Sequence, residues 1–82
     1  MPSAPEPPVR LDLRGTPCPL NYVRSKLALE RLELGACLQL DLDRGEPEQM
    51  VTEGLRGQGH AVEVQPHPQD PAAVRIRVVR HG

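Results

Sequence analysis

The feature that most restricts the fold of this chain is the alternation of apolar and polar residues in all four of its extended segments. Alternation of this kind is typical of strands that bury one face and expose the other. Two segments with helical spacing separate the first three strands, one from about Pro19 to Leu34 and one from about Pro47 up to Gly59. The order β-α-β-α-β-β predicts an α/β (α+β) two-layer sandwich, with a four-stranded mixed sheet and two helices on one face. The expected strands cover about residues 9–13, 37–43, 61–64 and 73–79.

Each predicted helix carries apolar residues at helical spacing. Such a stripe normally packs on the core, and we expect the charged residues between its members to face solvent. The first helix is predicted to use Leu20, Val23, Leu27 and Leu34, widened by Leu29 and Leu32. The second is predicted to use Met50, Val51 and Leu55.

The composition excludes several classes of protein. With 82 residues and a net charge of −1, the chain is one small domain and not a nucleic-acid binder that relies on bulk charge. Tyr22 is the only aromatic residue, which leaves no stacking platform for single strands. Two cysteines are too few for a disulfide scaffold, and no apolar run is long enough to span a membrane.

Residues 1–8 are rich in proline and are expected to form a disordered tail before a domain at residues 9–80. This tail lacks the basic start and the apolar centre of a signal peptide. We therefore expect a cytoplasmic protein whose thiols stay reduced.

The junction between the first strand and the first helix holds Cys18, one of the two cysteines. Gly15 to Pro17 should end the strand, and Pro19 suits the first helical position, which makes Cys18 the expected N-cap. A thiol at a helix N-terminus ionises more readily, because the dipole and free N–H groups stabilise the thiolate. The expected donors are the backbone N–H groups of Leu20 and Asn21, with Arg14 as a nearby cation. Cys18 is thus predicted to be a nucleophile or sulfur carrier, although a small side chain filling a tight turn is the alternative.

Two other residue types could carry chemistry. Cys37 shares its phase with polar residues at the start of the second strand, so it is either a second reactive thiol or a structural turn residue. His60 could act as a general base or metal ligand, or could simply occupy a turn. The histidines and cysteines show no zinc-ligand spacing, and we expect neither a metal nor a cofactor.

The open face of the predicted sheet should be rich in arginine. Arg10, Arg75 and Arg77 are candidates for docking to an acidic partner, while a solvated sheet face is the alternative. The residues expected on this face are Arg10, Asp12, Arg14, Gln39, Asp41, Arg75 and Arg77.

The stretch Asp12-Leu13-Arg14-Gly15-Thr16-Pro17-Cys18-Pro19, the helix after it, the acidic turn at Asp43 and Gly59-His60 together resemble the TusA/SirA-like sulfur-carrier family. The resemblance implies the β-α-β-α-β-β sandwich and a persulfide carried on Cys18. It also implies two kinds of partner. The sulfur donor would be a cysteine desulfurase or a rhodanese-like protein, and the acceptor would be a protein of tRNA thiolation, a cofactor-related pathway or sulfur oxidation. Asp12, Arg14 and Gly15 match the stretch before the cysteine, and Pro19 is the helix-starting proline.

The chain departs from the family motif Cys-Pro-x-Pro by reading Cys-Pro-Leu-Asn. Asn21 restores a backbone N–H and adds a side-chain amide, and either group could donate to the sulfur of Cys18.

Two other classes of function stay open from the sequence. One is a non-catalytic interaction or regulatory module that uses the arginine-rich face. The other is a redox protein with a reversible disulfide between Cys18 and Cys37, which requires Cα atoms within about 7 Å. A monomer or weak dimer is expected, without sequence-specific binding of nucleic acid and without a membrane.

Overall fold

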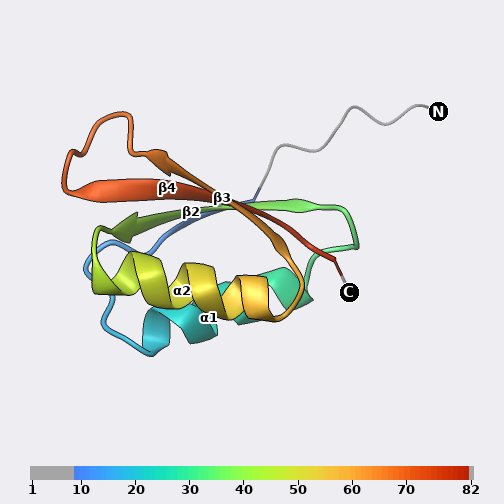
Figure 1. Cartoon of the computed structure of the whole chain (residues 1–82). Coiled ribbons are helices and arrows are strands. Elements are labelled where there is room, and N and C mark those ends of the chain that lie inside the picture. Colours follow the sequence, from blue (N-terminus) through green and yellow to red (C-terminus); the bar gives the residue numbers. More distant parts are fainter. Residues whose placement is uncertain (1–8, 82) are drawn as a thin grey trace.

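The computed structural model describes residues 9–81, and the predicted tail at residues 1–8 lies outside this range. Figure 1 shows a sheet with both helices packed on one face, so the predicted two-layer sandwich is confirmed. The elements follow the predicted order: β1 (Val9–Asp12), α1 (Leu20–Glu30), β2 (Cys37–Asp43), α2 (Glu46–Gly57), β3 (Ala61–Pro66) and β4 (Ala73–Val79).

The sheet is mixed, with strand order β1-β2-β4-β3. β1 runs parallel to β2, while β4 lies antiparallel to both β2 and β3. Because α1 follows β1 and α2 follows β2, both helices start at the edge of the sheet where these two parallel strands end. This edge therefore gathers the loop before α1 and the turn before α2.

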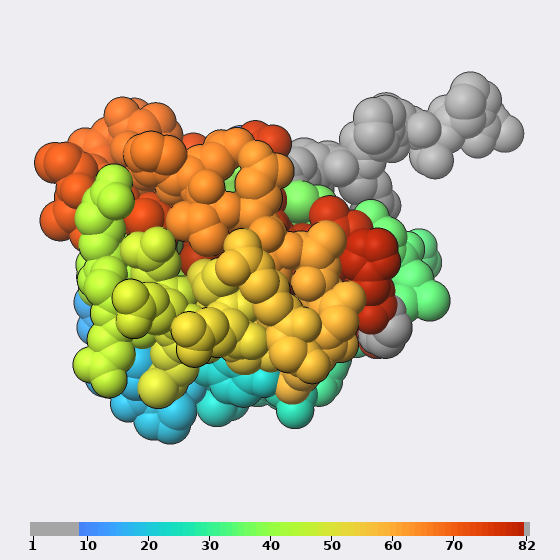
Figure 2. All heavy atoms as spheres, viewed as in Figure 1, coloured from blue at the N-terminus to red at the C-terminus, as the bar shows by residue number. Residues whose placement is uncertain are grey.

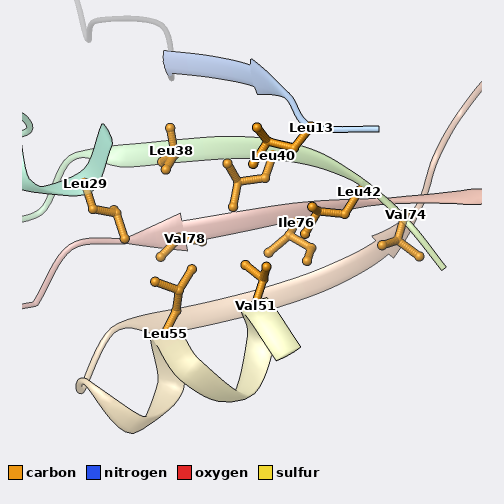
Figure 3. Close-up of a cluster of buried hydrophobic side chains, with 10 residues drawn as sticks. All are labelled: Leu13, Leu29, Leu38, Leu40, Leu42, Val51, Leu55, Val74, Ile76 and Val78. Carbon is orange, nitrogen blue, oxygen red and sulfur yellow. The ribbon is translucent and has the colours of Figure 1, made fainter. Parts of the chain in front are cut away.

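A purely aliphatic core lies between the sheet and the helices. The alternation in β2 and β4 was interpreted correctly, since every apolar residue assigned to the inner face of these two strands is buried. Figure 3 shows how the inner side chains of the sheet meet Leu29 of α1 and the two buried aliphatic residues of α2. The cluster consists of Leu13, Leu29, Leu38, Leu40, Leu42, Val51, Leu55, Val74, Ile76 and Val78.

The prediction for the inner face of α1 was wrong at most positions, since of its six residues only Leu29 is buried and only Leu32, beyond the end of the helix, is partly buried. The buried residues of this helix are Asn21, Ser25 and Leu29, and the helix ends at Glu30 instead of Leu34. The residues at 21, 25 and 29 share one face as well as the apolar set does, so spacing alone could not separate the two. The two polar residues are compatible with burial because the Ser25 hydroxyl donates to the Asn21 carbonyl at 2.8 Å, and the Asn21 amide is also bonded. The residues predicted inside but exposed are Leu20, Val23, Leu27, Leu34 and, on α2, Met50.

The two helices approach closely at a glycine. A Cβ on Gly54 of α2 would lie 2.5 Å from Cε1 of Tyr22 on α1, so only glycine admits the tyrosine ring at this distance. Gln58 donates to the Tyr22 hydroxyl at 2.6 Å. These contacts set the position of α1 relative to α2, and with it the position of the residues at the start of α1.

Candidate functional site

Cys18 lies half-buried in the turn immediately before α1. The helix begins at Leu20 with Pro19 in the N-cap position, so the prediction that Cys18 is the N-cap was wrong by one residue. Within this turn the Asn21 N–H donates to the Pro17 carbonyl at 3.2 Å, and the Cys18–Pro19 peptide bond is cis. Figure 2 shows the blue-to-cyan start of α1 directly beside the yellow-green start of α2.

The side chain of Asn21 contacts the sulfur of Cys18. Its Nδ2 lies 3.3 Å from Sγ, and its Oδ1 accepts the Tyr22 N–H at 2.7 Å. The second bond fixes the orientation of the amide, because an oxygen must face the N–H and the NH₂ group then faces the sulfur. Asn21 is fully buried, which limits its motion. The Asn21 backbone N–H is used by Pro17, so the donor to Cys18 is the amide side chain.

The loop that carries Cys18 is held against the end of β2. Leu13 donates its N–H to the Asp41 carbonyl at 2.8 Å, and Gly15 donates its N–H to Oδ2 of Asp43 at 2.7 Å. Gly15 has a φ of 77°, a conformation that glycine adopts without steric cost. The carboxylate of Asp43 was not singled out as a site residue, although the acidic turn that contains it was part of the family resemblance. These bonds place the thiol at the edge of the sheet where β1 and β2 end.

Arg14 directs its guanidinium group to two carboxylates, one at the end of β1 and one in the β3–β4 loop. It pairs with Asp12 at 2.8 Å and with Asp70 at 3.3 Å, so it links the β1–α1 loop to the β3–β4 loop. Hydrogen bonds from the Arg14 side chain and backbone lower the pKa of Asp12 to about 2. Arg14 was expected to supply charge beside the thiol, but the contacts of its guanidinium group assign it to positioning the loop.

The depressed pKa of Asp12 predicts a small loss of stability in strong acid. A carboxylate whose pKa is lower in the folded state stabilises the fold above its ordinary pKa of 3.8 and stops doing so as the pH falls through about 2. Because the side chain is half exposed, we expect less than about 1 kcal/mol. Urea unfolding from pH 5 to pH 2 should therefore show a steeper loss for wild type than for Asp12→Asn. Parallel pH profiles for the two proteins would contradict this assignment.

His67 is a buried residue that anchors the β3–β4 loop. Its Nδ1 accepts the N–H groups of Gln69 at 3.1 Å and Asp70 at 3.0 Å, which requires that this nitrogen carry no proton. Nε2 lies 3.5 Å from Oδ2 of Asp41, and Oδ1 of Asp41 accepts Nε of Arg75 at 3.0 Å. His67 thereby positions Asp70 for its pairing with Arg14. The sequence contained no sign of this role beyond a histidine between two prolines.

Replacing His67 with Ala should lower the free energy of unfolding by about 2 kcal/mol, because two backbone N–H groups and the Asp41 carboxylate lose their partner. Urea unfolding monitored by circular dichroism measures the loss. His81→Ala is the matched control, since the His81 side chain is exposed and its hydrogen bond to His60 uses only the backbone N–H. Equal stability of the two variants would exclude the anchoring role of His67.

Cys37 lies far from Cys18, which argues against the alternative of a reversible disulfide between them. Cys37 starts β2, whereas Gly15 of the Cys18 loop is bonded to Asp43 at the other end of the same strand. The six residue steps between Cys37 and Asp43 span about 20 Å, well beyond the 7 Å limit for bridged Cα atoms. Cys37 lines a shallow hollow of about 320 Å³ together with Glu63 and Arg77.

His60 occupies a turn at the edge of the sheet opposite the Cys18 loop. It directly precedes Ala61, which pairs with Val79, and Val79 in turn pairs with Cys37. Its Nδ1 accepts the backbone N–H of His81 at 3.1 Å. This contact connects the turn before β3 with the end of the described chain, and it keeps His60 apart from the thiol of Cys18.

The open sheet face carries both signs of charge. Arg10, Gln39 and Arg77 form one row across β1, β2 and β4, and Glu63 of β3 pairs in register with Arg77. In the next row Arg75 forms a salt bridge with Asp41. The sequence analysis did not include Glu63. With it, three acidic residues, Asp12, Asp41 and Glu63, share the strands of this face with Arg10, Arg75 and Arg77, whereas Arg14 lies in the loop after β1. Docking through Arg10, Arg75 and Arg77 stays a prediction.

The fold and the site together define a class of protein: a small two-layer α+β domain that presents one thiol at the start of its first helix. The family model described as sulfurtransferase TusA matches residues 9–80, and the chain therefore belongs to this family, as the resemblance implied. Neither helix in the described part of the chain has the length and apolar character needed to cross a membrane.

Two relatives agree with this assignment. One is a protein of Archaeoglobus fulgidus whose name assigns it as a sulfur carrier protein, 33% identical over 52 residues, which are 63% of this chain and 59% of the relative. This chain thus spans less than two thirds of that relative's length. The other is the crystal structure of a SirA-like protein from Desulfitobacterium hafniense, with a TM-score of 0.76 and 23% identity, covering 90% of this chain and 99% of that one. At this identity the second likeness concerns the fold alone.

Proposed function

We propose that this protein is a sulfur carrier that accepts sulfane sulfur on Cys18 as a persulfide and passes it to an acceptor protein. The observation that carries the proposal is the contact between the buried amide of Asn21 and the Cys18 sulfur, at the motif cysteine of a TusA-family chain. An N–H donor to Sγ favours the thiolate, which is the form that attacks the donor persulfide and the form in which Cys18 leaves after passing the sulfur on.

The transfer needs one thiol and no added oxidant or reductant. The Cys18 thiolate attacks the outer sulfur of a donor persulfide, forming a new S–S bond. The bond to the donor's inner sulfur breaks, and its electron pair leaves with the donor as a thiolate. In the second half of the cycle an acceptor thiolate attacks the outer sulfur on Cys18, and Cys18 leaves as a thiolate again. The partners are thus a donor, a cysteine desulfurase or a rhodanese-like protein, and a downstream acceptor protein.

The carrier cycle requires that Cys18 be reduced between transfers. The cytoplasm maintains thiols in this state, and we propose that the protein works there. The target pathways implied by the family are tRNA thiolation, cofactor-related sulfur transfer and sulfur oxidation. Identification of the acceptor would decide among them.

Intact-mass spectrometry tests the proposal directly. The wild-type protein is incubated with a cysteine desulfurase and cysteine, or with a rhodanese and thiosulfate, and its intact mass is then measured. We expect a gain of about 32 Da, the mass of one sulfur atom, that reduction removes. Peptide mapping after alkylation should place the added sulfur on Cys18 and leave Cys37 unmodified. Absence of any gain with both donors, or a gain confined to Cys37, would reject the carrier function.

A further inference from the structure

Helix α1, which follows Cys18 in the chain, exposes an apolar stripe to solvent. Leu20, Val23 and Leu27, called here the α1 stripe, are 42%, 42% and 52% exposed. At 3.6 residues per turn these positions share one face of the helix, which points away from Asn21, Ser25 and Leu29 on the core side. Single exposed aliphatic residues are ordinary, but a contiguous apolar patch with a polar rim marks a surface for another molecule.

The α1 stripe begins next to the carrier thiol. Leu20 is the first residue of α1 and follows Cys18 by two positions. Leu27 lies about 10 Å further along the helix, given a rise of 1.5 Å per residue. A protein seated on this stripe would therefore meet the half-buried sulfur at one end of the contact.

The rim of the α1 stripe is basic. Leu27 lines a shallow hollow of about 370 Å³ with Leu11, Ala28 and two cations, Arg24 and Arg31. Two cationic residues of α1, Arg24 and Lys26, together with Arg31 at its C-cap, outnumber the two acids of the same stretch, Glu30 and Glu33. Figure 2 shows α2 next to this helix, and α2 has the opposite balance, with Glu46, Glu48 and Glu53 against Arg56. The positive charge is thus specific to the helix that carries the stripe.

These charges select the kind of partner. Two copies of this chain meeting stripe to stripe would bring Arg24 and Arg31 of each against like charges, which opposes association. An apolar patch edged by Asp and Glu would instead bury the aliphatic side chains and pair with the arginines. A contact confined to one face of a short helix is small, as in transient interfaces, which suits a carrier that must leave one protein to reach the next.

We propose that the α1 stripe is the surface through which this chain docks onto its protein sulfur donor, and that the donor presents an apolar patch edged by carboxylates. The inference rests on the proposed carrier function of Cys18. It assigns the approach of the donor to α1, beside the thiol, and not to the arginine-bearing open face of the sheet.

The test compares the same substitution at two exposed leucines. Leu27→Glu places an acid in the middle of the α1 stripe, whereas Leu34→Glu lies beyond the end of α1 at a residue that is 69% exposed. Sulfur loading is followed by intact mass with two sources: a cysteine desulfurase with cysteine, and inorganic polysulfide. In the polysulfide reaction the Cys18 thiolate takes one sulfur atom and the polysulfide anion leaves one atom shorter, so no docking is involved.

We expect Leu27→Glu to lower kcat/KM for loading from the desulfurase at least tenfold, mainly through KM, while Leu34→Glu stays within twofold of wild type. Both variants should load from polysulfide at the wild-type rate. Raising the salt concentration should slow desulfurase loading of wild type, because it screens Arg24 and Arg31.

Three outcomes overturn the inference and separate it from the function on which it rests. Normal loading of Leu27→Glu from the desulfurase would exclude the α1 stripe as the docking surface and leave the carrier function intact. A wild-type dimer in sedimentation that Leu27→Glu converts to a monomer would assign the stripe to a second copy of the chain. Failure of wild type to gain sulfur even from polysulfide would reject the carrier function and the docking inference together.

Discussion

A Cys18→Ser variant should gain no sulfur from a desulfurase or a rhodanese under conditions in which wild type gains one atom. A serine hydroxyl cannot form a persulfide, so the expected loss is complete. The fold should survive, because Cys18 is only half-buried and lies in a turn before α1. An oxygen at this position can also accept the Asn21 amide, and we expect a change in unfolding free energy of less than about 1 kcal/mol. Intact mass and urea unfolding of the same sample separate loss of chemistry from loss of structure.

Cys37→Ser is the matched control for this experiment, since it removes the other free thiol of the chain. It should load as wild type does. Loss of function in both variants would point to a redox role in which both thiols take part, although not as an intramolecular disulfide. Full function in cells that carry Cys18→Ser would mean that the protein acts as an interaction module, and the arginines of the open sheet face would then be the residues to change next.

Replacing Asn21 with Ala should slow the reaction of Cys18 with iodoacetamide at pH 7, and its loading with sulfur, by about 3- to 10-fold. The amide of Asn21 donates to the sulfur from a fully buried position. A hydrogen bond to a charged group is worth about 1.5–3 kcal/mol, but a thiolate that loses such a bond is also a stronger nucleophile, which offsets about half of the loss in rate. Water reaching the half-buried sulfur would replace part of the lost bond and favours the lower end of the range.

Ser25→Ala is the matched control for Asn21→Ala. Ser25 is equally buried on the same face of α1, and its hydroxyl bonds the Asn21 carbonyl, not the thiol. We expect the two variants to lose similar stability, about 1–2 kcal/mol each, while only Asn21→Ala loses reactivity. Equal alkylation rates in the two variants would show that Asn21 is a packing residue without influence on the sulfur. Restoring the family's proline at this position would be a poor substitute test, because it also removes the backbone bond from Asn21 to Pro17.

The candidate site could be predicted from the sequence only in part. Cys18 stood out because it lies between a strand and a helix and is followed by a proline, which is local information. Asp43 and Asp70 did not stand out, because they reach the Cys18 loop from parts of the chain far away in sequence, and His67 acts only through its bond to Asp70. The same holds for Arg14, whose carboxylate partners differ from the role expected from its proximity to the thiol.

The sequence by itself determined the order of the elements and the faces of β2 and β4, because alternation with a period of two leaves only one set of residues for each face of a strand. The tertiary structure alone decided which face of α1 is buried. Leu20, Val23 and Leu27 match helical spacing no better than Asn21, Ser25 and Leu29 do, and hydrophobicity favoured the wrong set. Burial of Asn21 and Ser25 is possible because hydrogen bonds satisfy both polar side chains. The Asn21 amide bonds the Tyr22 N–H and the sulfur of Cys18, and the Ser25 hydroxyl bonds the Asn21 carbonyl.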